Sequence, residues 1–98
     1  MVKVEISKSS AKNKKLKAVF YDNEGKKIKT VNFGDSRYSD YLQHKDKERR
    51  ERYRKRHSVY LKGRGYDTAA HLSYWILWGD SSSLQTNINA YKKKYNLR

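Results

Sequence analysis

The chain has 98 residues, which is room for one domain built around one core. It contains 24 lysines and arginines against 10 aspartates and glutamates, so its formal net charge is +14. Such a charge repels itself in the compact state and is most often balanced by a polyanion, with nucleic acid as the first candidate. The chain has no cysteine, which excludes disulfides and thiolate metal sites.

The sequence gives no sign of secretion or of membrane insertion. No apolar segment follows the basic residue Lys3, so the N-terminus does not resemble a signal peptide. The longest apolar stretch, Tyr74–Trp78, is too short to cross a bilayer. We expect a protein of the cytoplasm, the nucleus or the inside of a particle, with no membrane partner.

Residues 1–34 are predicted to form a β-meander of three antiparallel strands. Val2, Val4 and Ile6 alternate with polar residues, as in a half-buried strand. A second strand follows over 16–21, and a third over 26–33 is rich in β-branched residues. The residues between these two strands have the composition of a tight turn. Short connections of this kind favour antiparallel neighbours.

Residues 39–57 are predicted to form a basic helix. Ser39 or Asp40 can cap its start, and Asp46 can cap a later start equally well. Acid-before-base pairs spaced four residues apart favour the helix. These pairs are Asp46–Arg50, Glu48–Arg52 and Glu51–Lys55. Tyr53 is the clear anchor within the basic run, so we expect the helix to lie on the surface along a narrow stripe.

Two further helices complete an α+β fold, a three-stranded antiparallel meander followed by three helices in a single domain over 1–98. Residues 68–78 are apolar on most sides and are followed by Gly79, which indicates a buried core helix packed on the sheet. Residues 83–95 are predicted to form an amphipathic C-terminal helix. Ser82 and Gln85 have the spacing of its capping box.

The candidate nucleic-acid contacts lie mainly in the 39–57 helix, where basic residues outnumber acidic ones. Arginine dominates its second half, and the planar guanidinium group suits phosphate. The expected contacts are Lys45, Arg49, Arg50, Arg52, Arg54, Lys55 and Arg56. The alternative is a solvated helix whose charges form internal ion pairs.

A second basic segment over 8–17 contributes Lys12, Lys14 and Lys15 as candidate contacts. It forms either a flexible arm that clamps a nucleic-acid backbone or a solubilising loop. Tyrosines near the basic runs either stack on bases or cover the sheet, and we expect the second because the core is sparse. These tyrosines are Tyr38, Tyr41, Tyr60 and Tyr66.

The chain is not expected to be an enzyme. Its histidines, His44, His57 and His71, lack the spacing of a metal-binding helix. We find no phosphate loop, nucleotide fingerprint or nucleophile motif. The sequence therefore predicts no catalytic residue, no metal site and no cofactor.

Several segments together resemble an uncharacterised family of small basic proteins from large double-stranded DNA viruses of algae and amoebae. The resemblance rests on Val31–Gly34, Tyr38–Tyr41, His44–Tyr53, Arg56, His57, Thr68–Trp78 and a final helix with Leu84, Ile88 and Tyr91. At 63–67 the chain has Gly-Arg-Gly-Tyr-Asp, where the family has a turn rich in Asn and Trp with a proline. The resemblance implies a viral setting, in the virion or in the host cytoplasm or nucleus, and carries no residue roles.

These observations predict a virus-encoded accessory or virion protein that binds nucleic acid through phosphates, with DNA favoured over RNA. Such binding is weakly sequence-specific and steeply salt-dependent. The alternative is a structural protein that docks on an acidic viral protein in a capsid or larger assembly, through a defined interface with an apolar anchor. A small regulator of a host or viral enzyme is a third class.

Overall fold

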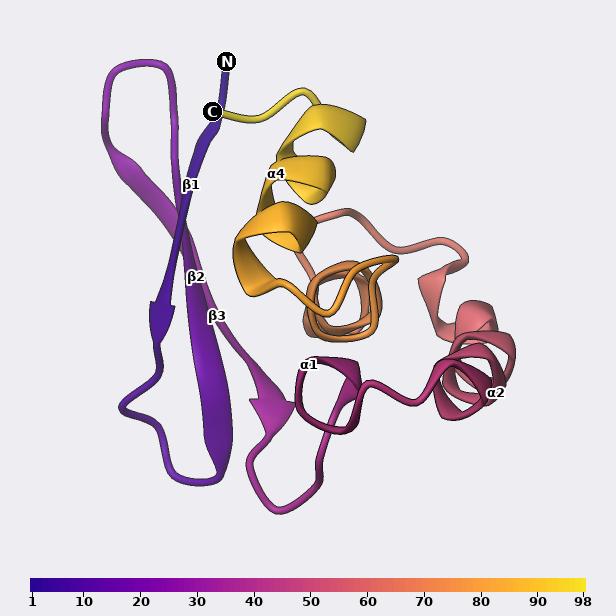
Figure 1. The fold of residues 1–98 in the computed structure, drawn as a ribbon. Helices are drawn as coiled ribbons and strands as arrows, with labels where there is room; N and C mark the ends of the chain where they lie inside the picture. The colour runs from indigo at the N-terminus through magenta and orange to yellow at the C-terminus, as the bar shows by residue number, and fades with distance from the viewer.

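The computed structural model describes residues 1–98 and confirms the α+β fold, with a three-stranded antiparallel sheet on one side and the helices on the other (Figure 1). The strands are β1 (Lys3–Lys8), β2 (Lys14–Tyr21) and β3 (Lys27–Asp35), in the order β1-β2-β3. Val4 lies opposite Phe20, and Leu16 lies opposite Phe33. This register gathers the apolar side chains of all three strands on the face that the helices cover.

The helical part begins after β3 and contains more elements than the three expected helices. They are α1 (Tyr41–His44), α2 (Lys47–His57), the 3-10 helix η1 (Ser58–Leu61), α3 (Ala69–Leu72), the π-helix η2 (Ser73–Leu77) and α4 (Leu84–Lys94). The predicted core helix is therefore α3 continued by η2. None of these helices is long and apolar enough to cross a membrane.

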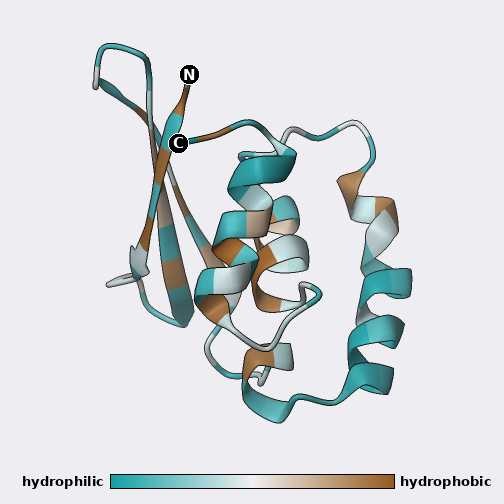
Figure 2. Cartoon of the chain, turned by 45° about the horizontal axis from the view of Figure 1, so that its top comes forward, coloured by the Kyte–Doolittle hydropathy of each residue, from teal (hydrophilic) through white to brown (hydrophobic).

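The region 39–57 forms two helices instead of the one expected. Asp40 accepts a backbone N–H of α1 at 2.9 Å, and Asp46 accepts two backbone N–H groups of α2 at 3.0 and 3.2 Å. Between them Lys45 has a φ of +57°, a left-handed conformation that ends α1. The chain turns there, and α2 stands apart from the other helices as a hydrophilic rod (Figure 2).

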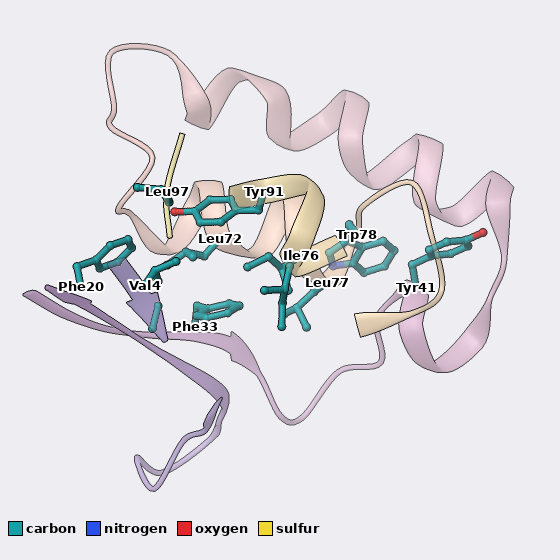
Figure 3. Packing of buried hydrophobic residues seen from close by; sticks show 12 residues of the cluster. Val4, Phe20, Phe33, Tyr41, Leu72, Ile76, Leu77, Trp78, Tyr91 and Leu97 are labelled. Atoms are coloured by element: carbon teal, nitrogen blue, oxygen red, sulfur yellow. The ribbon is translucent and has the colours of Figure 1, made fainter. Parts of the chain in front are cut away.

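The core lies between the sheet and the α3–η2–α4 layer (Figure 3). Its largest fully buried apolar and aromatic side chains are Val4, Phe20, Phe33, Leu72, Ile76 and Tyr91. The hydroxyl of Tyr91 donates to the carbonyl of Tyr66 at 2.6 Å, which satisfies its one polar atom. Burial raises the pKa of this hydroxyl well above its usual range, so Tyr91 stays neutral.

A buried amide fixes the connection between η2 and α4. Asn87 donates to the carbonyls of Ile76 and Ser81 at 2.9 and 2.7 Å, and its oxygen accepts the N–H of Ser81 at 3.1 Å. These bonds hold the loop that carries Asp80. The expected capping box of Ser82 and Gln85 is wrong: Ser83 caps α4, and its hydroxyl accepts the N–H of Thr86 at 3.4 Å.

Candidate nucleic-acid interface

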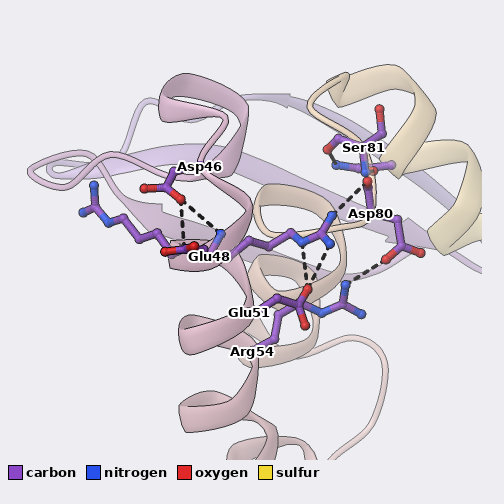
Figure 4. A network of polar contacts seen from close by, with 9 residues as sticks. Asp46, Glu48, Glu51, Arg54, Asp80 and Ser81 are labelled. Atoms are coloured by element: carbon purple, nitrogen blue, oxygen red, sulfur yellow. Dashed lines mark hydrogen bonds and ion pairs between the residues drawn. The ribbon is translucent and has the colours of Figure 1, made fainter.

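The arginines of α2 fall on two sides of the helix. Arg49, Arg52 and Arg56 recur at spacings of three and four residues, which places them on one flank. Arg54 lies on the side that faces η2 and the loop before α4 (Figure 4), and Arg50 donates to the carbonyl of Asp80 in the same loop. All five were predicted from the sequence as phosphate contacts, and the structure separates them into two groups.

Arg54 is held by an acid and by two aromatic rings. It donates to Asp80 Oδ1 at 2.8 Å, and its guanidinium lies 5.1 and 5.3 Å from the ring centres of Tyr74 and Trp75. The hydrogen bond from Arg54 lowers the pKa of the Asp80 carboxyl. Arg54 is therefore engaged within the protein, and its charge is already paired.

Arg50 is engaged in the same way. It donates to the Glu51 carboxylate at 2.9 Å and to the carbonyl of Asp80 at 3.0 Å, and it lies 4.9 Å from the ring centre of Tyr41. The three acid–base pairs expected at a spacing of four do not form, because Asp46 caps the helix and Glu51 pairs with its neighbour. Arg50 and Arg54 thus attach α2 to the rest of the fold.

An aromatic stack makes the second attachment of α2. The ring of Tyr53 lies parallel to that of Trp78, 4.0 Å between centroids, and the His57 ring stacks on its other side at 4.0 Å. Burial raises the pKa of Tyr53 to about 12, and burial together with the charge of Arg56 lowers the pKa of His57. The predicted anchoring role of Tyr53 is confirmed.

The partners in this stack were not predicted from the sequence. The i,i+4 spacing of Tyr53 and His57 was a usable signal for their contact. Trp78 lies 25 residues from Tyr53 along the chain, and no local pattern indicates that pairing.

A cleft of about 710 Å³ separates the arginine flank of α2 from the end of the sheet. Arg49, Arg52 and Arg56 line it from α2, and Lys14, Asp35 and Tyr38 line it from the sheet and the following turn. Ala69, Ala70, Ser73, Leu77 and Trp78 line it from α3, η2 and the residue after them. The cleft therefore combines a basic wall with a lining of small and apolar side chains.

Gly34 allows the sheet and η2 to approach each other beside the cleft. Its φ is +81°, and a Cβ there would lie 2.6 Å from a methyl carbon of Leu77. A larger residue at 34 would be strained in its backbone and would displace the side chain of Leu77.

The carboxylates in the cleft are neutralised by partners of their own. Asp35 pairs with Arg37 at 2.8 Å, which lowers the pKa of the Asp35 carboxyl to about 2. Asp40 pairs with Lys15 at 2.5 Å, and Lys15 also donates to Gln43 at 3.0 Å. Four basic side chains lining the cleft form no ion pair, and they are Lys14, Arg49, Arg52 and Arg56. The cleft thus has an uncompensated positive charge.

The remaining predicted contacts lie outside the cleft. Lys12, Lys45 and Lys55 are exposed, at the β1–β2 connection, the α1–α2 turn and the far flank of α2. The 8–17 segment is no free arm, because β2 begins at Lys14 and the N–H of Ser9 donates to the carbonyl of Lys15 at 3.1 Å. It is a hairpin that presents Lys12 at its tip and Lys14 beside the cleft.

The four candidate tyrosines divide evenly. Tyr41 is buried, and Tyr66 packs between Phe20 and Tyr95. The expectation that the tyrosines cover the core holds for these two. It is wrong for Tyr38 and Tyr60, whose exposed fractions are 67% and 49%. Of the two exposed rings, Tyr38 lines the cleft.

Fold and site together define a small basic α+β protein with an arginine-lined cleft. Residues 4–57 match the model of DUF5754, described as a family of unknown function. The match covers more than half of the chain, so the protein belongs to this family. It spans the three strands and α1–α2, which supply both basic sides of the cleft. Neither the curated proteins nor the solved structures gave a match.

Proposed function

We propose that the protein binds nucleic acid through backbone phosphates, with low sequence specificity. The main contacts are Arg49, Arg52 and Arg56 together with Lys14. One observation carries the proposal: these four side chains line one cleft without an acidic partner, while Arg50, Arg54 and Lys15 are paired within the fold.

The spacing of the three arginines suits a chain of phosphates. A helix rises about 1.5 Å per residue, so neighbouring members of the flank stand about 4.5 and 6 Å apart along its axis. Guanidinium groups bind phosphate oxygens in a bidentate manner. Three like charges on one flank repel one another, and a bound polyanion removes that repulsion. Lys12, at the tip of the β1–β2 hairpin, and Lys45, in the turn before α2, are exposed secondary contacts.

The biological setting that we propose follows from the resemblance described above. The genome of a DNA virus is a polyanion, and its phosphates can neutralise the net charge of +14 that this chain has. We therefore propose an accessory or virion protein without enzymatic activity, with DNA as the preferred nucleic acid.

The test is fluorescence anisotropy with random duplex DNA, single-stranded DNA and RNA over a salt series. Changing Arg49, Arg52 and Arg56 to Ala removes three phosphate contacts. The log–log salt slope is expected to fall by about 2 for a single strand and by nearly 3 for a duplex. Affinity at about 150 mM salt should fall at least tenfold.

A matched control separates these contacts from net charge. Changing Lys26, Lys27 and Lys93 to Ala also removes three positive charges, from exposed residues that neither line the cleft nor form ion pairs. This variant should keep most of the affinity and nearly all of the salt slope. Equal losses in both triple variants would contradict the assignment of the cleft. Absence of binding to all three nucleic acids near physiological salt would end the nucleic-acid proposal.

One observation favours the second candidate, docking on an acidic protein surface. Val59 and Tyr60, in η1 directly after α2, have exposed fractions of 57% and 49%. Apolar side chains next to a basic helix have the composition of an interface anchor. This candidate requires a stoichiometric complex with one acidic protein that is lost when both residues are changed to Ser.

A further inference from the structure

We infer that the cleft selects single-stranded nucleic acid, with one unstacked base lying against Tyr38 while the flanking phosphates contact the arginine flank of α2. The inference rests on the proposed function and names its substrate class. It combines three observations: an exposed aromatic ring that lines the cleft, a wall of arginines without acidic partners, and exposed acidic residues of α2 outside the cleft.

Tyr38 is exposed although the protein has few apolar residues to cover its core. It follows β3 and lines the cleft, where its exposed fraction is 67%. Its ring stacks on no other ring, and its hydroxyl makes no hydrogen bond within the protein. Every nucleobase offers a π-face, so a free ring beside phosphate-binding arginines is the arrangement found in sequence-tolerant single-strand binding.

The turn that carries Tyr38 is held in place. Asp35 accepts two hydrogen bonds from the Arg37 side chain, at 3.0 and 2.8 Å, and its carbonyl accepts the N–H of Tyr38 at 3.2 Å. The ring is therefore presented from a defined backbone, which reduces the entropy that is lost when a base stacks on it.

The cleft has the size and lining for a base with its neighbouring sugar and phosphates. Its volume of about 710 Å³ lies within the range of sites that enclose small organic ligands, about 300 to 1,000 Å³. Ala69, Ala70 and Leu77 give it apolar surface beside the arginines. A base that loses its contact with the neighbouring bases of the strand gains an apolar contact with these side chains in the cleft.

A duplex does not fit this arrangement. Helices read duplex DNA by inserting an exposed face into the major groove, which is about 12 Å wide. The arginine flank of α2 lines the cleft, whereas Glu48 and Glu51 are exposed and do not line it. Insertion of α2 into a groove would bring both carboxylates near phosphates, and this repulsion opposes duplex binding.

The experiment compares three 12-mers at one salt concentration: oligo(dT), a duplex, and an abasic strand with the same phosphates but no bases. Oligo(dT) should bind the wild-type protein more tightly than the duplex or the abasic strand does. Tyr38→Ala should weaken oligo(dT) binding at least about fivefold and leave the other two unchanged, because stacking needs a base. Tyr38→Phe keeps the π-face and should retain wild-type affinity.

Tyr60→Ala is the matched control, since Tyr60 is also an exposed tyrosine but lies outside the cleft. It should leave all three affinities unchanged. The single-strand inference is overturned if Tyr38→Ala binds oligo(dT) as the wild type does, or if the duplex binds as tightly as the single strand. In either case the triple arginine variant still decides separately whether the protein binds nucleic acid through the cleft. Circular dichroism of each variant verifies that the fold is intact.

Discussion

Arg52 and Arg54 stand two positions apart on α2, yet their guanidinium groups meet different surroundings. Arg52 is exposed, lines the cleft and has no acidic partner. The side chain of Arg54 is 17% exposed, lies against Tyr74 and Trp75, and pairs with Asp80. Residue type alone therefore does not decide which arginines are available to a ligand; the direction in which each leaves the helix does.

The two single alanine variants should have opposite effects. Arg54→Ala removes two cation–π contacts and an ion pair, so we expect the free energy of unfolding to fall by about 1–2 kcal/mol. Its affinity for nucleic acid should stay within about twofold. Arg52→Ala should leave stability unchanged or slightly higher, since it relieves repulsion, while the salt slope falls by about 0.7 to 0.9.

Urea unfolding and anisotropy on the same two preparations measure both quantities. Because the variants differ only in position, each is the control for the other. A loss of affinity in Arg54→Ala equal to that in Arg52→Ala, at unchanged stability, would show that the two faces of α2 are assigned incorrectly.

At the scale of elements, α2 is the least integrated helix. None of its residues is buried, and it is attached by the Tyr53–Trp78 stack and by two arginines around Asp80. An element with few buried contacts opens locally at a lower free energy than the core does. We therefore expect α2, which forms the basic wall of the cleft, to exchange its amide protons faster than the sheet does.

Removing the stack should release α2 without unfolding the sheet. We expect Tyr53→Ala to increase amide exchange rates within Lys47–His57 about tenfold, because the stacked pair and the area that it buries contribute at least about 1.4 kcal/mol. Exchange in β2 and β3 should not change. Hydrogen exchange measured by mass spectrometry resolves these segments, and Tyr38→Ala is the control, at an exposed ring that packs on no other ring. Uniform acceleration across the chain would instead mean that α2 and the sheet unfold as one unit.

The features that the sequence predicted correctly are local ones. The alternation of Val4 and Ile6 needs only the period of a strand, and the caps at Asp40 and Asp46 need only the adjacent backbone. Whether those two caps mark one helix or two depended on Lys45, whose left-handed conformation no propensity indicates. The cap of α4 was placed one residue early, because Ser82 and Ser83 have nearly the same local pattern.

The features that the sequence did not predict depend on distant contacts. Helical ion pairs at a spacing of four contribute only about 0.2 to 0.5 kcal/mol, so tertiary partners displace them easily. Asp80 forms an ion pair with Arg54, which is 26 residues away along the chain. This pairing leaves other arginines of α2 unpaired beside the cleft. The basic character of α2 was therefore predictable, whereas the cleft and the exposure of Tyr38 beside it required the three-dimensional arrangement.

At the scale of the whole molecule, the net charge of +14 is confined to a body of 42 × 27 × 24 Å. At 10 mM salt the Debye length is about 30 Å, so most charges in the protein act on one another. At 150 mM it is about 8 Å, and only near neighbours remain coupled. We therefore expect the melting temperature to rise between these two salt concentrations, in the wild type and in both triple variants.

A short polyphosphate separates this diffuse screening from a defined site. Sodium tripolyphosphate, compared with sodium chloride at the same ionic strength, should stabilise the wild type further, because a ligand that binds only the folded state adds RT ln(1 + [L]/Kd). At ten times its Kd that contribution is about 1.4 kcal/mol, or a rise of about 6 to 11 °C in Tm for a chain of this size. The variant with Ala at 49, 52 and 56 should lose this additional rise, and the variant with Ala at 26, 27 and 93 should keep it. Equal rises in all three proteins, measured by calorimetry, would show that the positive charge acts only as a diffuse field and that the cleft is no phosphate site.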